Sequence, residues 1–195
     1  LYKESKVERY LDLAKRAVVY LQSIAVGDES GTLIPYLDNP KTGPTWDKYY
    51  LSTCHGPVGT TLVFRMLYEL TGEQEYLDWI KRLARGIIRA GAPEKNSWGY
   101  WASNCQCCGA PGVLEHFVSV YELTGEEEFL EYAKRTADVL VGDSQLLDGK
   151  RRWMSAWNRP TPEVVKSFTG FYVGSAGGSS SLLKPYSALE NKPFT

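Results

Sequence analysis

Residues that can bind a soft metal ion gather at two points of this chain. Cys54 and His55 are adjacent, and Cys107 and Cys108 follow about 53 residues later, just after Cys105. Zinc is bound tetrahedrally by Cys sulfur and His nitrogen, and catalytic zinc sites use three protein ligands and leave a fourth position open. Cys54, His55 and one of the two later thiols supply that number of ligands. The pattern therefore predicts a Zn²⁺ centre.

The two cysteine motifs belong to an internal repeat. Residues 54–59, Cys-His-Gly-Pro-Val-Gly, align without a gap with residues 107–112, Cys-Cys-Gly-Ala-Pro-Gly, and the match continues into a shared Tyr-Glu-Leu-Thr-Gly-Glu. A fixed period of this size indicates stacked copies of one supersecondary unit. Stacking brings equivalent points of the copies together. Because Cys107 aligns with Cys54, it is our preferred third ligand, and Cys108 is the alternative.

A structural zinc site is the first alternative to a catalytic one. It requires a fourth protein ligand, which Cys108 or Cys105 could supply. A lone cysteine is most often a small buried hydrophobic residue. Cys105, between Asn104 and Gln106, is interpreted as a loop residue outside the site, with a redox or fourth-ligand role as the alternative. Three of the four cysteines lie within four residues. Such clustering favours metal binding in a reducing compartment over a disulfide framework, so we expect the chain to be cytoplasmic.

The elements that must position these ligands are helices. Apolar residues at a spacing of three and four predict an amphipathic helix over residues 7–21. A mostly apolar helix over 56–70 precedes a charged amphipathic helix over 76–87, and the same pair recurs over 109–123 and 129–140. A Thr-Gly turn separates the members of each pair, which indicates an αα-hairpin. The less charged helices suit burial and the amphipathic helices suit an outer layer.

Stacked hairpins of this kind build a solenoid or a closed α/α toroid. We therefore predict an all-α fold of one of these two kinds, in a single domain over residues 1–195 with repeats that start near 54, 107 and 172. The third copy has Tyr172 at the position of Cys54, and Pro185 is expected to shorten its helix.

An outer helix, two full hairpins and a final inner helix are too few to close a ring. We therefore expect the chain to be an incomplete portion of a larger barrel, or to pair with another chain. Alternatively, the N-terminal helix packs on the last inner helix and completes a third hairpin.

Three more side chains are candidates for acid–base chemistry. Tyr172 replaces a ligand in the third copy, so its hydroxyl is a candidate proton donor. His116 lies in the first helix of the second copy, where a buried, hydrogen-bonded role is more ordinary than that of a general acid. Glu115 is expected to face solvent, with a place in a central cavity as the alternative. Aromatic residues that pack the loops or line a cleft recur before these helices: Trp98, Tyr100, Trp101, Trp153 and Trp157.

Charge and hydropathy exclude several classes of partner. The net charge is −1, which gives no electrostatic reason to expect nucleic acid or an acidic membrane surface. No apolar stretch approaches the ~18–20 residues that a membrane-spanning helix needs. The first residues lack the features of a signal peptide.

The motifs resemble those of the lanthionine synthetase C-like proteins, a family of α/α toroids with six or seven hairpins and zinc at the centre. Residues 54–56, Cys-His-Gly, and residues 107–112 resemble the two metal-binding motifs of the family, and residues 170–177 resemble its last glycine-rich helix start. The two thiol motifs occur in the reverse of the order found in lantibiotic cyclases. With Gln106 before Cys107, the chain is closer to uncharacterised bacterial members that have Cys-His-Gly-Pro followed by Gln-Cys-Cys-Gly.

This resemblance implies that zinc activates a thiol, which adds to a dehydroamino acid and forms a thioether. The thiol substrate would be a peptide cysteine or a small thiol such as glutathione, and a missing N-terminal half or another chain would complete the toroid. One alternative is a carbohydrate-active α/α-barrel enzyme, which requires a pair of carboxylates where only Glu115 is found. The other is a noncatalytic, zinc-stabilised module that binds peptides.

Overall fold

The structure is a computed structural model that describes most of the chain. The described residues are 2–39, 43–44, 49–97, 99–100, 103–156, 161 and 163–189. The helices are α1 (Tyr2–Ser5), α2 (Glu8–Ser23), α3 (Pro57–Thr71), α4 (Gln74–Arg89), α5 (Ala110–Thr124), α6 (Glu127–Gly142) and α7 (Ser175–Leu189). The strands are β1 (Val26–Asp28), β2 (Gly31–Leu33), β3 (Asp38–Asn39), β4 (Gly43–Pro44), β5 (Ser144–Leu147), β6 (Lys150–Trp153), β7 (Ser155–Ala156) and β8 (Val165–Lys166).

The predicted helical hairpins are confirmed. Helices α3 and α5 each have 15 residues, and α4 and α6 each have 16. Gly72 and Gly125 follow α3 and α5 with φ values of 71° and 69°, a left-handed conformation that glycine adopts without a steric cost. Helix α2 also has 16 residues and matches the outer helices in length. The period found in the sequence is therefore a period of the structure.

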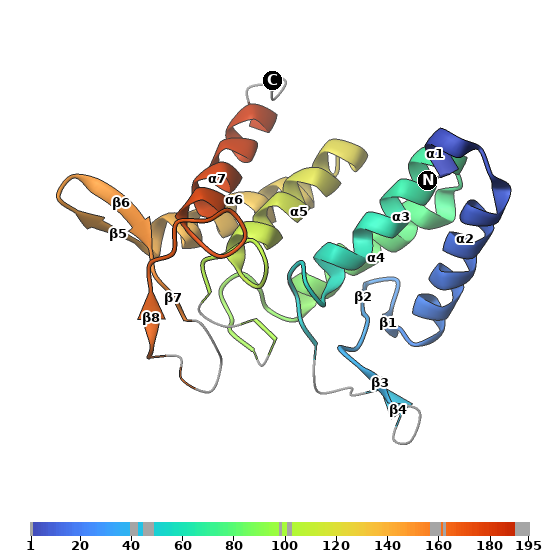
Figure 1. The fold of residues 1–195 in the computed structure, drawn as a ribbon, viewed down its shortest axis with the longest axis horizontal. Helices are drawn as coiled ribbons and strands as arrows, with labels where there is room; N and C mark the ends of the chain where they lie inside the picture. The colour runs from blue at the N-terminus through green and yellow to red at the C-terminus, as the bar shows by residue number, and fades with distance from the viewer. Residues whose placement is uncertain are drawn as a thin grey trace.

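The hairpins lie side by side and form an open arrangement (Figure 1). Helix α5 packs against α3 on one side and α7 on the other, and the amphipathic helices α4 and α6 pack against these inner helices. The fold is all-α and of the α/α-toroid class. Helices α2 and α7 lie at opposite ends of the arrangement (Figure 1). The alternative in which the N-terminal helix completes a third hairpin with α7 is therefore wrong.

The hydrophobic core lies between the inner and outer helices. Phe64 and Phe117 occupy equivalent positions in α3 and α5, and both are fully buried. Each amphipathic helix buries the apolar face that its sequence pattern predicts. In α4 this face includes Tyr76, Trp79, Ile80, Leu83, Ala84 and Ile87. Burial of side chains of this size stabilises a fold by about 1.5–3 kcal/mol each. This core fixes the inner helices and so fixes the turns that precede them.

Short antiparallel hairpins follow two of the outer helices, where the sequence analysis predicts only loops. Strands β1 and β2 pair after α2, and β5 and β6 pair after α6. The first hairpin packs on α4, and a Cβ atom at Gly86 would collide with the backbone of Thr32. Two shorter pairs, β3 with β4 and β7 with β8, also form. These hairpins lie in the segments that connect α2 to α3 and α6 to α7.

Helix α7 departs from the prediction for the third copy. Pro185 was expected to shorten this helix, but α7 continues to Leu189. A proline removes one backbone hydrogen bond and disfavours the turn before it, and helices with a proline in the interior tolerate this cost when they are held by neighbours. Because α7 packs on both α5 and α6, the third inner helix is as long as the first two.

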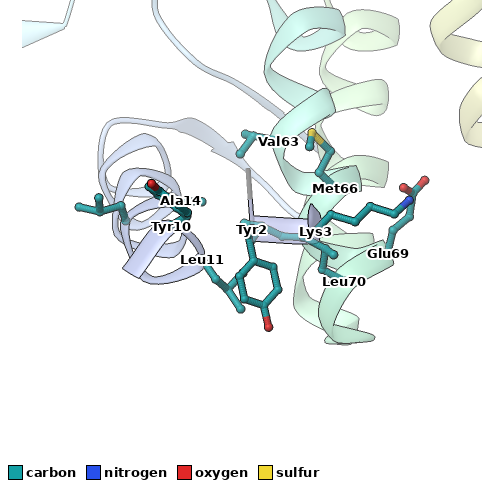
Figure 2. A pocket seen from close by; sticks show the side chains of 11 residues that line it. Tyr2, Lys3, Tyr10, Leu11, Ala14, Val63, Met66, Glu69 and Leu70 are labelled. Carbon is teal, nitrogen blue, oxygen red and sulfur yellow. The ribbon is translucent and has the colours of Figure 1, made fainter. Parts of the chain in front are cut away.

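An apolar groove lies between α1, α2 and α3 (Figure 2). Its volume is about 450 Å³, and Tyr10, Leu11, Val63 and Met66 are among its lining residues. By repeat equivalence this side of α3 corresponds to the side of α5 that α3 contacts, since Met66 aligns with Ser119, and the Ser119 hydroxyl accepts a hydrogen bond from Arg65 of α3. The groove is therefore the exposed side of the first repeat. Among the described residues, none of the helices combines the length and the apolar character that crossing a bilayer requires.

Candidate metal centre

Each motif lies in a tight turn that leads into an inner helix. Gly56 and Gly109 precede α3 and α5 in an extended conformation, and a proline follows in the first helical turn. A Cβ atom at either glycine, or at Gly174 before α7, would collide with the backbone six residues earlier. Glycine is needed here because the chain folds back on itself. The turns thus place residues 54–55 and 107–108 at the same end of neighbouring inner helices.

A repeated backbone hydrogen bond joins the turns of successive copies. The N–H group of Cys54 donates to the carbonyl of Cys107 at 3.1 Å, and the N–H group of Cys107 donates to the carbonyl of Tyr172 at 3.1 Å. The Thr53 hydroxyl also donates to the carbonyl of Gln106 at 2.8 Å. The predicted equivalence of positions 54, 107 and 172 is therefore a structural equivalence, and it fixes the distance between the first two turns.

Three thiols meet at this junction. The Sγ atoms of Cys54 and Cys108 are 3.3 Å apart, and those of Cys107 and Cys108 are 3.4 Å apart. All three sulfur atoms lie within 4.8 Å of one another. Cys54 is exposed and the other two are half-buried. We call Cys54, Cys107 and Cys108 the thiol cluster, and it contains both alternatives for the third ligand.

The thiols share their protons unequally. The contact with the Cys108 sulfur lowers the pKa of Cys54 from 9.0 to about 6. The contacts with Cys105 and Cys54 raise the pKa of Cys108, and burial raises the pKa of Cys107. A divalent cation replaces the protons that such crowded thiols hold, since thiolates are the form that binds zinc. The three cysteines fit a zinc ion, because thiolates are soft ligands that favour zinc.

His55 lies beside the thiol cluster without joining it. Its ring packs against Tyr36 and Tyr50, with ring centroids 4.9 Å and 5.1 Å apart. Both tyrosines come from the loop that precedes the first motif. The structure thus brings together three of the four predicted ligands and directs the imidazole toward an aromatic pair.

Cys105 is buried and contacts Cys108 of the thiol cluster. Its Sγ atom is 3.1 Å from the Ser103 hydroxyl. The contact with Cys108 is the largest cause of a pKa of Cys105 lowered to about 6. Cys105 therefore interacts with the thiol cluster, from which the sequence pattern predicts that it stands apart.

A cavity of about 320 Å³ lies next to the thiol cluster, between the inner faces of α3, α5 and α7. We call it the central cavity. Its polar and charged lining side chains are Thr61, Arg65, Glu115, His116, Ser119, Tyr172 and Lys184, together with residues of both thiol turns, Thr53 and Gln106. Among the described lining residues, Glu115 alone carries a carboxylate, so the pair that a glycosidase requires is not found there.

His116 is buried in the wall of the central cavity, with 5% of its surface exposed. Its Nε2 atom has no hydrogen-bond partner within the described part of the chain, which differs from the hydrogen-bonded histidine that was the ordinary expectation. Burial lowers the pKa of the imidazole to about 4, so the ring is neutral at pH 7. Tyr172 lines the same cavity and is 68% exposed.

The sequence analysis did not find a polar network around Glu115. The carboxylate accepts hydrogen bonds from Gln106 and from the Ser181 hydroxyl, and it pairs with the Lys184 ammonium group. Glu115 therefore faces the cavity and connects α7 to the turn that contains Cys107. A carboxylate on a mostly apolar inner helix was the signal for this role, but two of its partners, Ser181 and Lys184, lie 66 and 69 residues away in the sequence.

The loop aromatics that the structure describes pack the loops. Tyr100 and Trp153 are buried, and the Trp153 indole donates a hydrogen bond to the carbonyl of Leu140 at 2.7 Å. Burial raises the pKa of Tyr100. Trp98, Trp101 and Trp157 lie outside the described residues.

The helical hairpins and the thiol motifs occur in a chain that matches one known protein family. The profile of one family, described as lanthionine synthetase C-like protein, matches residues 1–192. The chain belongs to the lanthionine synthetase C-like family. No curated protein matches the chain. In this lanthionine synthetase C-like chain, the stacked hairpins are those of the family's α/α toroid, and the thiol cluster lies where two of its inner helices begin.

Proposed function

We propose that the chain binds zinc at Cys54, Cys107 and Cys108 and activates a substrate thiol for addition to a dehydroamino acid. The product is a thioether. The observation that carries this proposal is the thiol cluster, in which two repeats bring three sulfur atoms within 4.8 Å of one another. Membership of the lanthionine synthetase C-like family supports the class of reaction.

The donor set supports an open metal position. Three thiolates give a tetrahedral ion three protein ligands, and Cys54 is exposed, so a substrate can approach from its side. Bound zinc would lower the pKa of a coordinated thiol so that its thiolate exists at neutral pH. The packing of His55 between Tyr36 and Tyr50 supports leaving the imidazole out of the ligand set.

The residues of the central cavity would supply the proton that the addition requires. Attack of the thiolate on the β-carbon forms the carbon–sulfur bond and leaves negative charge on the carbonyl group and the α-carbon. His116 is neutral at pH 7, so it suits a hydrogen bond to the substrate rather than acid catalysis. Tyr172 has the exposed hydroxyl in the same cavity, and we assign it the proton donor.

The substrate class follows from the cavity and the open position. A peptide cysteine and a small thiol both fit a centre that is open on the Cys54 side, and Arg65 and Lys184 place positive charge beside Glu115 in the cavity. We propose that such a thiol is the partner and that another chain or further hairpins complete the toroid. The free thiols require a reducing environment, for which we propose the cytoplasm.

An addition assay tests this function directly. Zinc-loaded protein is mixed with N-acetyl-dehydroalanine methyl ester and with either glutathione or a cysteine-containing peptide, and thioether formation is followed by mass spectrometry. We expect zinc-dependent product and its loss in Cys108→Ser, while Cys105→Ser, the control with an equally small change, keeps it. Equal rates with and without zinc, or in Cys108→Ser, would rule the proposed site out.

A noncatalytic zinc module is the second candidate, because one contact favours it. The Cys105 thiol is hydrogen-bonded to Cys108 and could become a fourth sulfur ligand. A zinc ion closed by four sulfur atoms would stabilise the repeats and have no position for a substrate. The coordination number distinguishes this candidate from the enzyme.

A further inference from the structure

Two thiol pairs of the cluster, Cys54–Cys108 and Cys54–Cys107, span two repeats, and the first has the closer contact that the structure describes. The Sγ atoms of Cys54 and Cys108 are 3.3 Å apart, and the N–H groups of Thr53 and Cys54 both donate to the carbonyl of Cys107 at 3.1 Å. The two backbones are therefore already held together where a covalent bond would form. A disulfide has an S–S distance of about 2.05 Å, so bond formation requires the two sulfur atoms to move closer than they lie in the reduced protein. We propose that Cys54 and Cys108 form a reversible disulfide and that the cluster alternates between metal binding and this bond.

The other pairings suit a disulfide less well. Cys107 and Cys108 are neighbours in the chain, and consecutive Cα atoms are about 3.8 Å apart, below the usual range of about 4.4–6.8 Å for disulfides. Cys105 and Cys108 have the Cys-x-x-Cys spacing of redox motifs, which makes them the main competitor. Cys105 is buried, however, while Cys54 is exposed and meets an oxidant first.

The oxidation is balanced with a peroxide as the oxidant. The sulfur of Cys54 attacks one peroxide oxygen and becomes a sulfenic acid, and the first water leaves. The Cys108 sulfur then attacks that sulfur, the S–S bond forms, and the thiol proton leaves with the sulfenic hydroxyl group as the second water. The two thiols lose two electrons and two protons, and hydrogen peroxide is reduced to two waters. A dithiol reverses the change by thiol–disulfide exchange.

Disulfide formation would remove two of the three thiolates that hold the metal ion. A sulfur in a disulfide no longer offers the thiolate that zinc binds, so the ion is released. This release rests on the proposed zinc site. The disulfide itself depends only on the positions of the two side chains, so the two statements can be tested separately.

Peptide mapping tests the pairing. Trypsin places Cys54 in the peptide of residues 49–65 and the other three cysteines together in the peptide of residues 96–134. Zinc-loaded and metal-free protein are treated with one equivalent of hydrogen peroxide, and the digest is analysed without reduction. We expect the two peptides to be linked, the number of free thiols to fall from four to two, and dithiothreitol to restore all four.

Single variants identify the partner of Cys54. The linked peptides should persist in Cys105→Ser and Cys107→Ser and disappear in Cys108→Ser. A disulfide confined to residues 96–134, or four free thiols after treatment, would overturn the proposal. A chromophoric chelator measures zinc in parallel, and about one equivalent should appear with the disulfide. Retention of zinc after the disulfide has formed would overturn the proposed release of the metal. Protein that never binds zinc would overturn the proposed function, and the peptide map would then test the disulfide by itself.

Discussion

A buried imidazole distinguishes the second repeat from the first. His116 occupies the position at which the first repeat has Val63, and burial lowers its pKa from 6.5 to about 4. Above pH 6.5 the ring is neutral in both the folded and the unfolded chain. As the pH falls from 6.5 toward 4, the unfolded chain binds a proton that the folded chain does not. The free energy of unfolding therefore falls, by about 3 kcal/mol over the whole window.

We predict that His116→Val removes this acid sensitivity. Urea unfolding of metal-free protein at pH 7 and pH 5 measures it, and the parent should lose about 2 kcal/mol more than the variant between the two values. Nε2 of His116 has no partner among the residues that the structure describes, so the substitution strands no hydrogen bond there. The exposed His55, changed to Gln, is the control and should behave as the parent. The same loss in His116→Val and in the parent would contradict a neutral buried ring.

The positions of the cysteines in the site could be predicted from the sequence better than those of the other site residues. Cys54 and Cys107 were found because a gap-free repeat puts them at equivalent points, and the backbone bonds between the turns confirm that equivalence. The position of the His55 ring could not be predicted, since it depends on tyrosines from an irregular loop. The network of Glu115 depends on how α7 lies against α5, which a helical pattern does not specify.

At the scale of elements, the turns before the inner helices are the most constrained part of the fold. A Cβ atom at Gly109 would collide with the carbonyl of Ser103, which is backbone and has no room to move. We predict that Gly109→Ala lowers the free energy of unfolding by about 2 kcal/mol or more. It should also weaken zinc binding, because the same turn contains Cys107 and Cys108. Denaturant unfolding and zinc titration measure the two effects.

Gly142 is the matched control for this substitution. It is the last residue of α6, and no atom lies within 4 Å of a Cβ built there. Gly142→Ala should therefore change the free energy of unfolding by less than about 1 kcal/mol, and in the stabilising direction. Equal effects of the two alanines would mean that the turn is looser than the structure indicates.

The helices could be predicted from sequence because each carries its own signals. The Thr-Gly stops after α3 and α5 place the left-handed glycines, and the apolar face of α4 is buried as its periodicity predicts. Strands β1 and β2 carried no such signal, since each has three residues and pairs only with its neighbour. Strands β5 and β6 carried one that was missed, because Asp148-Gly149 between them forms a two-residue hairpin turn with φ values of 49° and 71°. The length of α7 was mispredicted because packing outweighed the proline.

At the scale of the whole molecule, zinc would connect two repeats that otherwise meet through packing and backbone bonds. Only the folded chain presents ligands from both turns, so binding stabilises the fold. We predict that zinc at about 100 times its dissociation constant raises the free energy of unfolding by about 2.7 kcal/mol. Denaturant unfolding with zinc and with a chelator measures the difference. Cys105→Ser should keep this response and Cys54→Ser should lose it, and the opposite pattern would place the metal elsewhere.

The central claim is that the repeats of this lanthionine synthetase C-like chain assemble an open zinc centre. X-ray absorption at the zinc edge, with metal content from mass spectrometry of the same sample, tests it most directly. We predict one zinc per chain, bound by three sulfur atoms at about 2.3 Å and one lighter atom that a thiol substrate replaces with a fourth sulfur. Four sulfur atoms in the absence of substrate, or protein that contains no zinc after loading, would contradict the account.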